Sequence, residues 1–313
     1  MPPPNTRDTW DTFPTETPLL DLLPTEQPNP RTADLDRLDT LGVLNRIADE
    51  DATVAAAVRR ALPEIARAVD LALERWRRGG RIVLFGAGTS GRLATLDAAE
   101  LIPTYGTPPE RYLARTAGGR EALWRPVEGA EDDRADGASA ASDLSPDDLA
   151  FGIAASGRTP WLIAALEQAR RRGAATVGLA CVAQPLLAAA CDVVIAVETG
   201  PEAVAGSTRL KAGTAQKLVL NAFSTALMVR LGKVYRNLMV DLRATNQKLR
   251  RRALRLVQQS TGADEPSALG ALAAADGSVK LAIALLRLGL TPAEAARRLD
   301  AADGHLATAL GEP

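Results

Sequence analysis

The sequence contains almost no histidine. One histidine, His305, stands near the C-terminus of the 313 residues. A Ser-His or Cys-His catalytic pair and a histidine-rich zinc site all need imidazole groups, so these kinds of site are nearly excluded. Any acid–base chemistry in this protein must therefore come from carboxylates, lysine, tyrosine or water.

Cysteine is nearly as rare, and neither sign of charge is in excess. Cys181 and Cys191 are the only two cysteines, so we expect small core residues and no disulfide framework. The 37 basic and 38 acidic residues give a formal net charge of -1. A nucleic-acid or anionic-membrane partner usually requires a basic excess, so neither partner is expected.

Long apolar runs are also missing. No uncharged apolar segment reaches the roughly 18 residues that cross a bilayer. The N-terminus, MPPPNTRDTWDTFPTE, lacks the basic start and the apolar run of a signal peptide. The sequence therefore predicts a cytoplasmic protein with no membrane partner.

Hydrophobic patterning divides the chain into four predicted parts. Residues 1–24 are rich in Pro and Thr and lack periodicity, which predicts a flexible tail. Residues 25–79 repeat Leu, Ile and Val at helical spacing and are predicted to form N-terminal helices. Residues 80–255 form the predicted ligand-binding domain, and residues 256–313 a small helical C-terminal domain.

The central part alternates between strand and helix patterns. Such alternation predicts an α/β fold with a parallel sheet. One long helical segment over 210–259 and a bundle of three short helices within 266–299 are expected to follow. The five predicted strands cover 81–85, 112–119, 149–156, 175–180 and 193–198.

Two turns rich in Ser, Thr and Gly follow the first and third predicted strands. They read GAGTSGR (86–92) and ASGRTP (155–160). Glycines admit an anion close to the backbone, hydroxyls donate to it, and a following helix N-terminus attracts it. The first turn fits the spacing G-x-G-x-x-G, but no acidic residue ends the second strand to bind a ribose. A single phosphomonoester therefore suits the two turns better than a dinucleotide, with ordinary tight βα connections as the alternative.

These turns belong to longer blocks that resemble the N-acetylmuramic acid 6-phosphate etherase family. The resemblance runs from about residue 25 to the end, and the blocks occur in the family's order. It implies the SIS (sugar isomerase) fold, a three-layer α/β fold with a five-stranded parallel sheet. The blocks are GAGTSGRL (86–93), DAAE (97–100), EGAEDD (128–133), GIAASGRTP (152–160), GSTRLKAGTAQKLVLN (206–221) and GKVYRNLMVD (232–241).

The resemblance also implies a reaction. The family cleaves the D-lactyl ether of N-acetylmuramic acid 6-phosphate by elimination and water addition, giving N-acetylglucosamine 6-phosphate and D-lactate. No metal or organic cofactor is implied, the substrate is a small sugar phosphate, and the active unit is expected to be a homodimer. The alternatives are a non-catalytic sugar-phosphate sensor and an isomerase or deaminase of the same fold.

Two glutamates match the family's catalytic positions. The resemblance implies Glu100 as the general acid at the ether oxygen and Glu131 as the base at carbon 2. By the residues alone, each would more often be a solvated surface carboxylate. Leu101 and Ile102 stand where the family usually has Cys-Pro, beside the predicted acid, and they could alter substrate fit.

Further residues are predicted to hold the substrate. Ser207 is a candidate for binding or, with Thr208, for capping the next helix, and Lys217 is a second candidate cation beside Lys211. The positive charges of Lys211 and Lys217 would balance the phosphate and the carboxylate of the substrate. The predicted substrate and phosphate contacts are Thr89, Ser90, Arg92, Ser156, Arg158, Thr159, Ser207 and Lys211.

Overall fold

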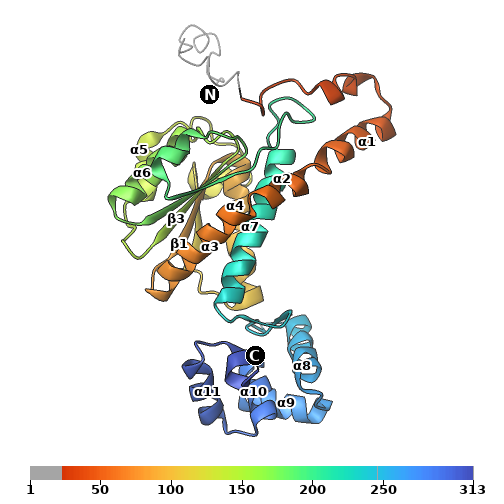
Figure 1. The fold of residues 1–313 in the computed structure, drawn as a ribbon, viewed down its shortest axis with the longest axis vertical. Helices are drawn as coiled ribbons and strands as arrows, with labels where there is room; N and C mark the ends of the chain where they lie inside the picture. The colour runs from red at the N-terminus through yellow and green to blue at the C-terminus, as the bar shows by residue number, and fades with distance from the viewer. Residues whose placement is uncertain (1–22, 245, 313) are drawn as a thin grey trace, which may run out of the picture.

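A five-stranded parallel sheet lies at the centre of the protein in a computed structural model that describes residues 23–244 and 246–312 (Figure 1). The sheet order is β2-β1-β3-β4-β5, which confirms the predicted fold class. The strands are β1 (Ile82–Gly86), β2 (Tyr112–Thr116), β3 (Leu149–Ala154), β4 (Ala175–Ala180) and β5 (Val193–Ala196).

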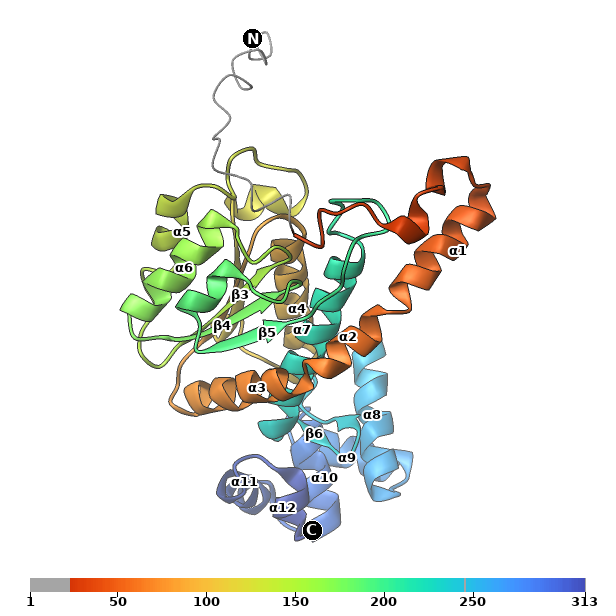
Figure 2. The same ribbon diagram turned by 45° about the horizontal axis from the view of Figure 1, so that its top comes forward.

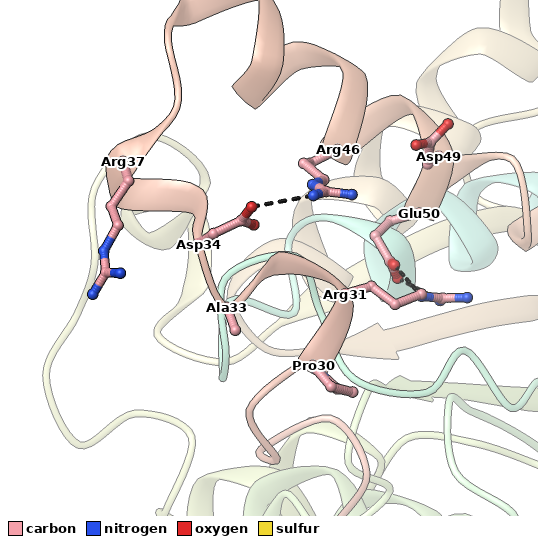
Figure 3. A pocket seen from close by; sticks show the side chains of 8 residues that line it. All are labelled: Pro30, Arg31, Ala33, Asp34, Arg37, Arg46, Asp49 and Glu50. Carbon is pink, nitrogen blue, oxygen red and sulfur yellow. Dashed lines mark hydrogen bonds and ion pairs between the residues drawn. The ribbon is translucent and has the colours of Figure 1, made fainter.

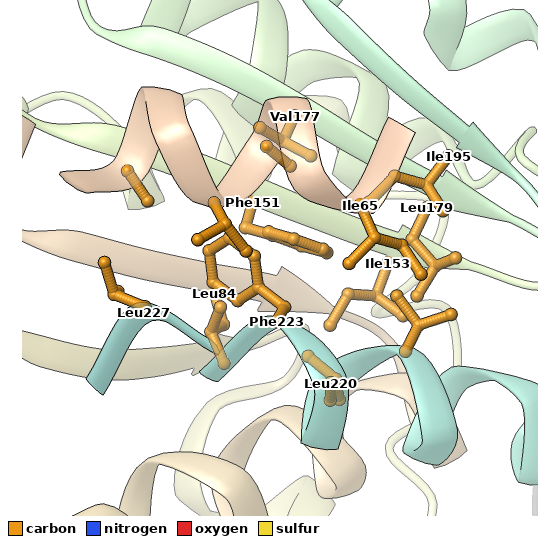
Figure 4. Packing of buried hydrophobic residues seen from close by; sticks show 14 of the residues in the cluster. Ile65, Leu84, Phe151, Ile153, Val177, Leu179, Ile195, Leu220, Phe223 and Leu227 are labelled. Carbon is orange, nitrogen blue, oxygen red and sulfur yellow. The ribbon is translucent and has the colours of Figure 1, made fainter. Parts of the chain in front are cut away.

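Helices cover both faces of the sheet and make three layers. The central strands β1, β3 and β4 are buried along their whole length, because both of their faces pack against helices. On one face, strand residues such as Phe151 contact α7, where the Phe151 and Phe223 rings lie 4.8 Å apart (Figure 4). That face holds α3 (Leu62–Arg77), α4 (Gly88–Tyr105) and α7 (Lys211–Arg230), and the other holds α5 (Arg134–Ala140) and α6 (Pro160–Arg171).

The N-terminal helices reach beyond the sheet. Two short 3₁₀ turns, Pro30–Thr32 and Leu35–Arg37, lead into α1 (Thr40–Asp51) and α2 (Val54–Arg60). Helix α1 projects away from the sheet (Figures 1 and 2). Most of the predicted tail, residues 1–22, lies outside the described residues, whereas Leu23 is buried in the cluster that includes Phe85 and Ala154.

The predicted continuous helical segment over 210–259 is wrong in its middle. Helix α7 ends at Arg230, and a short hairpin of β6 (Val234–Tyr235) and β7 (Leu238–Met239) precedes α8 (Gln247–Thr261). Gly232 adopts φ +72, and a Cβ there would lie 2.8 Å from the Gly304 carbonyl oxygen. The apolar spacing continues through this break because Tyr235 and Val240 pack on the C-terminal helices instead of the sheet.

The C-terminal helices share a separate core. The three predicted short helices are present, and α8 and α12 join them in one buried cluster. Among the described residues, no single helix is long and apolar enough to span a membrane. One pair, α9 and α10, passes that test only together, and it is bent by 115°. The short helices are α9 (Glu265–Ala274), α10 (Val279–Leu288), α11 (Pro292–Ala301) and α12 (Leu306–Leu310).

Candidate active site

The strand order brings the two predicted turns together. Strands β1 and β3 are hydrogen-bonded neighbours, and Gly86 at the end of β1 pairs with Ile153 near the end of β3. The sheet reverses its order here, with β2 on one side of β1 and β3 on the other, and ligands bind at such switch points. The first turn opens α4 and the second opens α6, so two helix N-termini meet at this edge.

The second turn presents polar groups that donate no hydrogen bond to other residues that the structure describes. Gly157 adopts φ +65, and a Cβ there would lie 2.3 Å from Pro185 Cβ, so only glycine fits. The half-buried hydroxyls of Ser156 and Thr159 donate no hydrogen bond within the described residues, although Ser156 Oγ accepts one from the Arg158 amide at 3.2 Å. Arg158 Nε is buried and also lacks a partner there. These donors are free for an anion.

In the first turn, by contrast, the polar side chains of Ser90 and Arg92 already make hydrogen bonds within the protein. A Cβ on Gly91 would lie 2.5 Å from Thr116 Cγ2, so this glycine lets α4 approach β2 closely. Ser90 is 7% exposed and donates to Gln216 Oε1 at 2.9 Å. Arg92 Nε donates at 3.1 Å to the carbonyls of Ala122 and Leu123, so Arg92 fastens the 3₁₀ turn Gly119–Leu123 to α4.

The structure holds Glu131 against the second turn. Its backbone carbonyl accepts a hydrogen bond from the Trp161 amide at 2.9 Å, in the first turn of α6. Trp161 Nε1 in turn donates to Asp136 at 2.6 Å, and a Cβ on Gly137 would lie 2.1 Å from the Trp161 carbonyl oxygen. The Glu131 side chain is exposed. The loop that carries this carboxylate is thus fastened beside Ser156 and Thr159.

Glu100 lies elsewhere in the chain. It follows Ser90 by ten residues on α4, which is about 15 Å along the helix axis. Its side chain is exposed and makes no hydrogen bond or ion pair within the described residues. Within the described residues, therefore, no hydrogen bond or ion pair links Glu100 to the second turn or to the Glu131 loop.

Asp97, one turn before Glu100, is buried, whereas Glu100 is exposed. Asp97 accepts hydrogen bonds from Tyr112 at 2.8 Å and Ser224 at 3.1 Å. Lys217 Nζ lies 3.8 Å from Asp97 Oδ1, and the lysine side chain is 31% exposed. Lys217 is thus a partly accessible cation between α4 and α7.

Burial raises the pKa of Asp97, and the Tyr112 hydrogen bond and the Lys217 charge only partly oppose that shift. A carboxyl with a raised folded-state pKa stabilises the fold most at low pH, and this contribution is lost as the pH rises through that pKa. The unfolding free energy of Asp97→Asn relative to wild type should therefore increase as the pH rises above about 4, the ordinary pKa of an aspartate. Urea unfolding at several pH values measures this difference, with the exposed Asp132→Asn as control, and a pH-independent difference would contradict the prediction.

Lys211 is buried in an ion pair. Its Nζ lies 2.6 Å from Glu50 Oε2, and neither side chain is more than 2% exposed. Arg31 Nε binds the same carboxylate at 2.6 Å. Lys211 was predicted to contact the substrate, and in the structure its charge is instead neutralised by Glu50.

Glu202 caps the N-terminus of α7, and the sequence did not predict this role. The fully buried carboxylate of Glu202 accepts the amides of Lys211 at 2.8 Å and Ala212 at 2.9 Å. The predicted capping by Ser207 and Thr208 is therefore wrong. Within the described residues the half-buried Ser207 side chain makes no hydrogen bond, which leaves its hydroxyl free for the predicted substrate contact.

A groove of about 560 Å³ lies beside the Lys211–Glu50 pair, between the 3₁₀ turns and α1 (Figure 3). Its basic side chains face an equal number of acidic ones, and Arg46 pairs with Asp34 at 3.1 Å. This balance offers no excess positive charge to an anionic substrate. Among the described residues, no group of three or more His, Cys, Asp or Glu is placed to hold a metal ion. The charged lining residues are Arg31, Arg37, Arg46, Asp34, Asp49 and Glu50.

Known protein families match the α/β part of the chain. The model for the glucokinase regulatory protein N-terminal SIS domain matches residues 64–170, and the SIS domain model matches residues 126–226. A solved phosphoheptose isomerase from Francisella tularensis superposes with a TM-score of 0.51 at 17% identity, covering 61% of this chain and 100% of that one. At this identity the likeness shows the fold alone.

Curated relatives match nearly the whole chain. It is 53% identical over 294 residues to the N-acetylmuramic acid 6-phosphate etherase of Mycolicibacterium smegmatis, covering 93% of this chain and 99% of the relative. The etherase of Deinococcus radiodurans is 51% identical over 296 residues, with 94% and 97% covered. The similarity thus extends through the N-terminal and C-terminal helices as well as the sheet.

Proposed function

The chain belongs to the N-acetylmuramic acid 6-phosphate etherase family, and we propose that it cleaves the D-lactyl ether of N-acetylmuramic acid 6-phosphate. The products are N-acetylglucosamine 6-phosphate and D-lactate, so the enzyme is a carbon–oxygen lyase. The observation that carries this proposal is the 53% identity across 93% of the chain. The two hydroxyl-bearing turns at the switch point of the sheet support it.

We assign the substrate phosphate to the edge where the two turns meet. Ser156, Thr159 and Arg158 Nε offer donors that are unused in the described structure. Thr89 and Ser207 are half-buried and belong to the same proposed site. The N-termini of α4 and α6 add favourable electrostatics for a dianion.

The chemistry needs one base and one acid. The proton at carbon 2 is acidic only while carbon 1 is an open-chain aldehyde. The base removes that proton, its electron pair forms the carbon 2–carbon 3 double bond, and the ether bond at carbon 3 breaks as the acid protonates the departing oxygen. Water then adds at carbon 3. We assign the base to Glu131, whose loop is fastened to the second turn, and the acid to Glu100.

We propose a cytoplasmic homodimer in which Glu100 acts in the partner's site. The position of Glu100 supports this, because the residue is exposed and follows Ser90 by about 15 Å along the α4 axis. Helix α1 also exposes Leu41 at 65% and Leu44 at 57%, apolar surface that a second copy would cover. We assign Arg92 and Lys211 an indirect role in the site. Arg92 would hold the Ala122 and Leu123 backbone in place, and Lys211 would do the same for Glu50.

Incubation with N-acetylmuramic acid 6-phosphate tests the proposed function directly. We expect equal amounts of D-lactate and N-acetylglucosamine 6-phosphate, and water labelled with oxygen-18 should place the label at carbon 3 of the sugar. Label in the lactate would overturn the elimination mechanism. Tight sugar-phosphate binding without D-lactate would instead favour a regulatory sensor, the alternative that the match to the glucokinase regulatory protein domain keeps in view.

A further inference from the structure

One buried amide lies beneath the proposed phosphate site. Gln216 on α7 is 1% exposed, and its Oε1 accepts the Ser90 hydroxyl proton at 2.9 Å. Its Nε2 is buried and has no hydrogen-bond partner within the described residues. The only acceptor indicated for it there is the Cys181 thiol, a weak one, and a buried amide nitrogen without a good acceptor is unfavourable and calls for an explanation.

Gln216 also connects to the second turn. The Cys181 thiol is a polar neighbour of the Gln216 side chain, and burial raises the pKa of this thiol to about 12, so it stays protonated. The Cys181 amide donates to the Ala155 carbonyl at 2.9 Å, at the start of the second turn. Gln216 is therefore positioned between Ser90 of the first turn and the strand end that supports Ser156.

The hydrogen-bond count at Ser90 shows what the amide could do. A serine hydroxyl has one proton, and here that proton goes to Gln216 Oε1 and is not available to a phosphate. A half rotation of the amide would direct Nε2 at Ser90 Oγ and release the Ser90 proton. The same rotation would give Nε2 an acceptor and turn Oε1 towards the Cys181 thiol, a weak donor. A glutamine can do this because its amide carries both a donor and an acceptor.

We propose that Gln216 is a positioning residue for Ser90. By rotating its amide, it lets the Ser90 hydroxyl redirect its hydrogen bond from Gln216 to the phosphate of the bound sugar. The proposal deepens the proposed function and rests on it. In the free protein the Ser90 hydroxyl donates its hydrogen bond to Gln216 Oε1. With a sugar phosphate bound, Gln216 Nε2 donates to Ser90 Oγ and the hydroxyl donates to a phosphate oxygen.

Gln216→Glu tests the switch, with N-acetylglucosamine 6-phosphate binding measured by calorimetry. At pH 8 the carboxylate can only accept, so it keeps the Ser90 proton, and Kd should rise about 10- to 100-fold, the loss of a hydrogen bond to a charged group. Lowering the pH towards about 5.5 should protonate the buried carboxyl and restore part of the affinity relative to wild type. Gln259→Glu on the exposed side of α8 is the matched control and should bind normally.

A second set of variants separates the switch from simple charge repulsion. In a Ser90→Ala background, Gln216→Glu should lose most of its pH-dependent effect on Kd, since no serine proton remains. Gln216→Met, which adds no charge, should reduce the effect of Ser90→Ala, because coupled residues are not additive.

Several results would overturn the proposal. One is a Kd ratio of Gln216→Glu to wild type that stays flat with pH, and another is a pH dependence that persists unchanged without Ser90. Additive effects of Gln216→Met and Ser90→Ala would overturn it even if Gln216→Glu failed to fold. D-lactate release is measured separately on wild type, so its absence would contradict the proposed function while sugar-phosphate binding still tests the role of Gln216.

Discussion

Replacing Glu131 with glutamine is expected to lower kcat for D-lactate release by about 1,000-fold, within the usual range for a general acid–base group. The amide keeps the size of the side chain but cannot take the proton from carbon 2. The backbone bond from the Trp161 amide to the Glu131 carbonyl is untouched, so the loop should stay in place and KM should change little. Steady-state kinetics with a D-lactate assay measures both constants.

Glu128→Gln is the matched control, because Glu128 is an exposed glutamate three residues earlier in the same loop. It should keep nearly all of the wild-type activity. If Glu131→Gln and Glu100→Gln both turned over at the wild-type rate, the assignment of these two carboxylates would fail while the family membership would stand.

Mixed dimers extend this prediction to the proposed shared site. Glu100→Gln and Glu131→Gln chains, each nearly inactive alone, should recover up to half of the wild-type activity when combined in one dimer. One of its two sites would then contain an intact Glu131 from one chain and an intact Glu100 from the other. No recovery in purified mixed dimers would show that both glutamates act within the same chain.

Replacing Lys211 with methionine is expected to destabilise the fold by about 3 kcal/mol, as for other buried ion pairs that lose one partner. Glu50 is 1% exposed, so its carboxylate would keep only Arg31 as a charged partner. Burial by itself would raise the pKa of Glu50, but hydrogen bonds from Arg31 and Lys211 hold it below its ordinary value. Its stabilising effect is therefore present at neutral pH and is lost on acidification through the folded-state pKa.

Urea unfolding at neutral pH measures this loss. Lys248→Met, at an exposed lysine on α8, is the matched control and should change stability by a few tenths of a kcal/mol at most. Adding Glu50→Gln to Lys211→Met should restore part of the stability, because it removes the charge that was left behind. A Lys211→Met protein as stable as wild type would show that the buried pair contributes nothing.

Local patterns predicted the elements that depend on neighbouring residues. The apolar run of β1 predicts a strand. The glycines and hydroxyls that follow it, within a dozen positions, predict an anion-binding turn. The predicted helix through residues 231–246 failed because its apolar spacing serves a different core. Gly232, at φ +72, ends α7 locally, with backbone hydrogen bonds back into the last helical turn, and its close approach to the Gly304 carbonyl oxygen joins residues far apart in the chain.

The polar contacts of the site lay beyond sequence reasoning for the same reason. Ser90 and Gln216 are 126 positions apart, and Glu50 and Lys211 are 161 apart. Lys211 and Lys217 looked equivalent as candidate cations, yet one is neutralised inside the protein and the other is partly accessible. Glu202 carried one usable signal, since it is an acid in the loop that leads into a helix N-terminus.

The sequence by itself determined the strands, the two turns and the carboxylates available in place of histidine, because these depend on residue type and short spacing. Only the tertiary structure decided which groups meet. Pairing β1 with β3 puts the two turns at one edge of the sheet. The packing of α7 on α4 brings Gln216 within hydrogen-bond distance of the Ser90 hydroxyl. Burial then distinguished Lys211 from Lys217. A charge inside a protein requires a partner, whereas one at the surface remains free for a ligand.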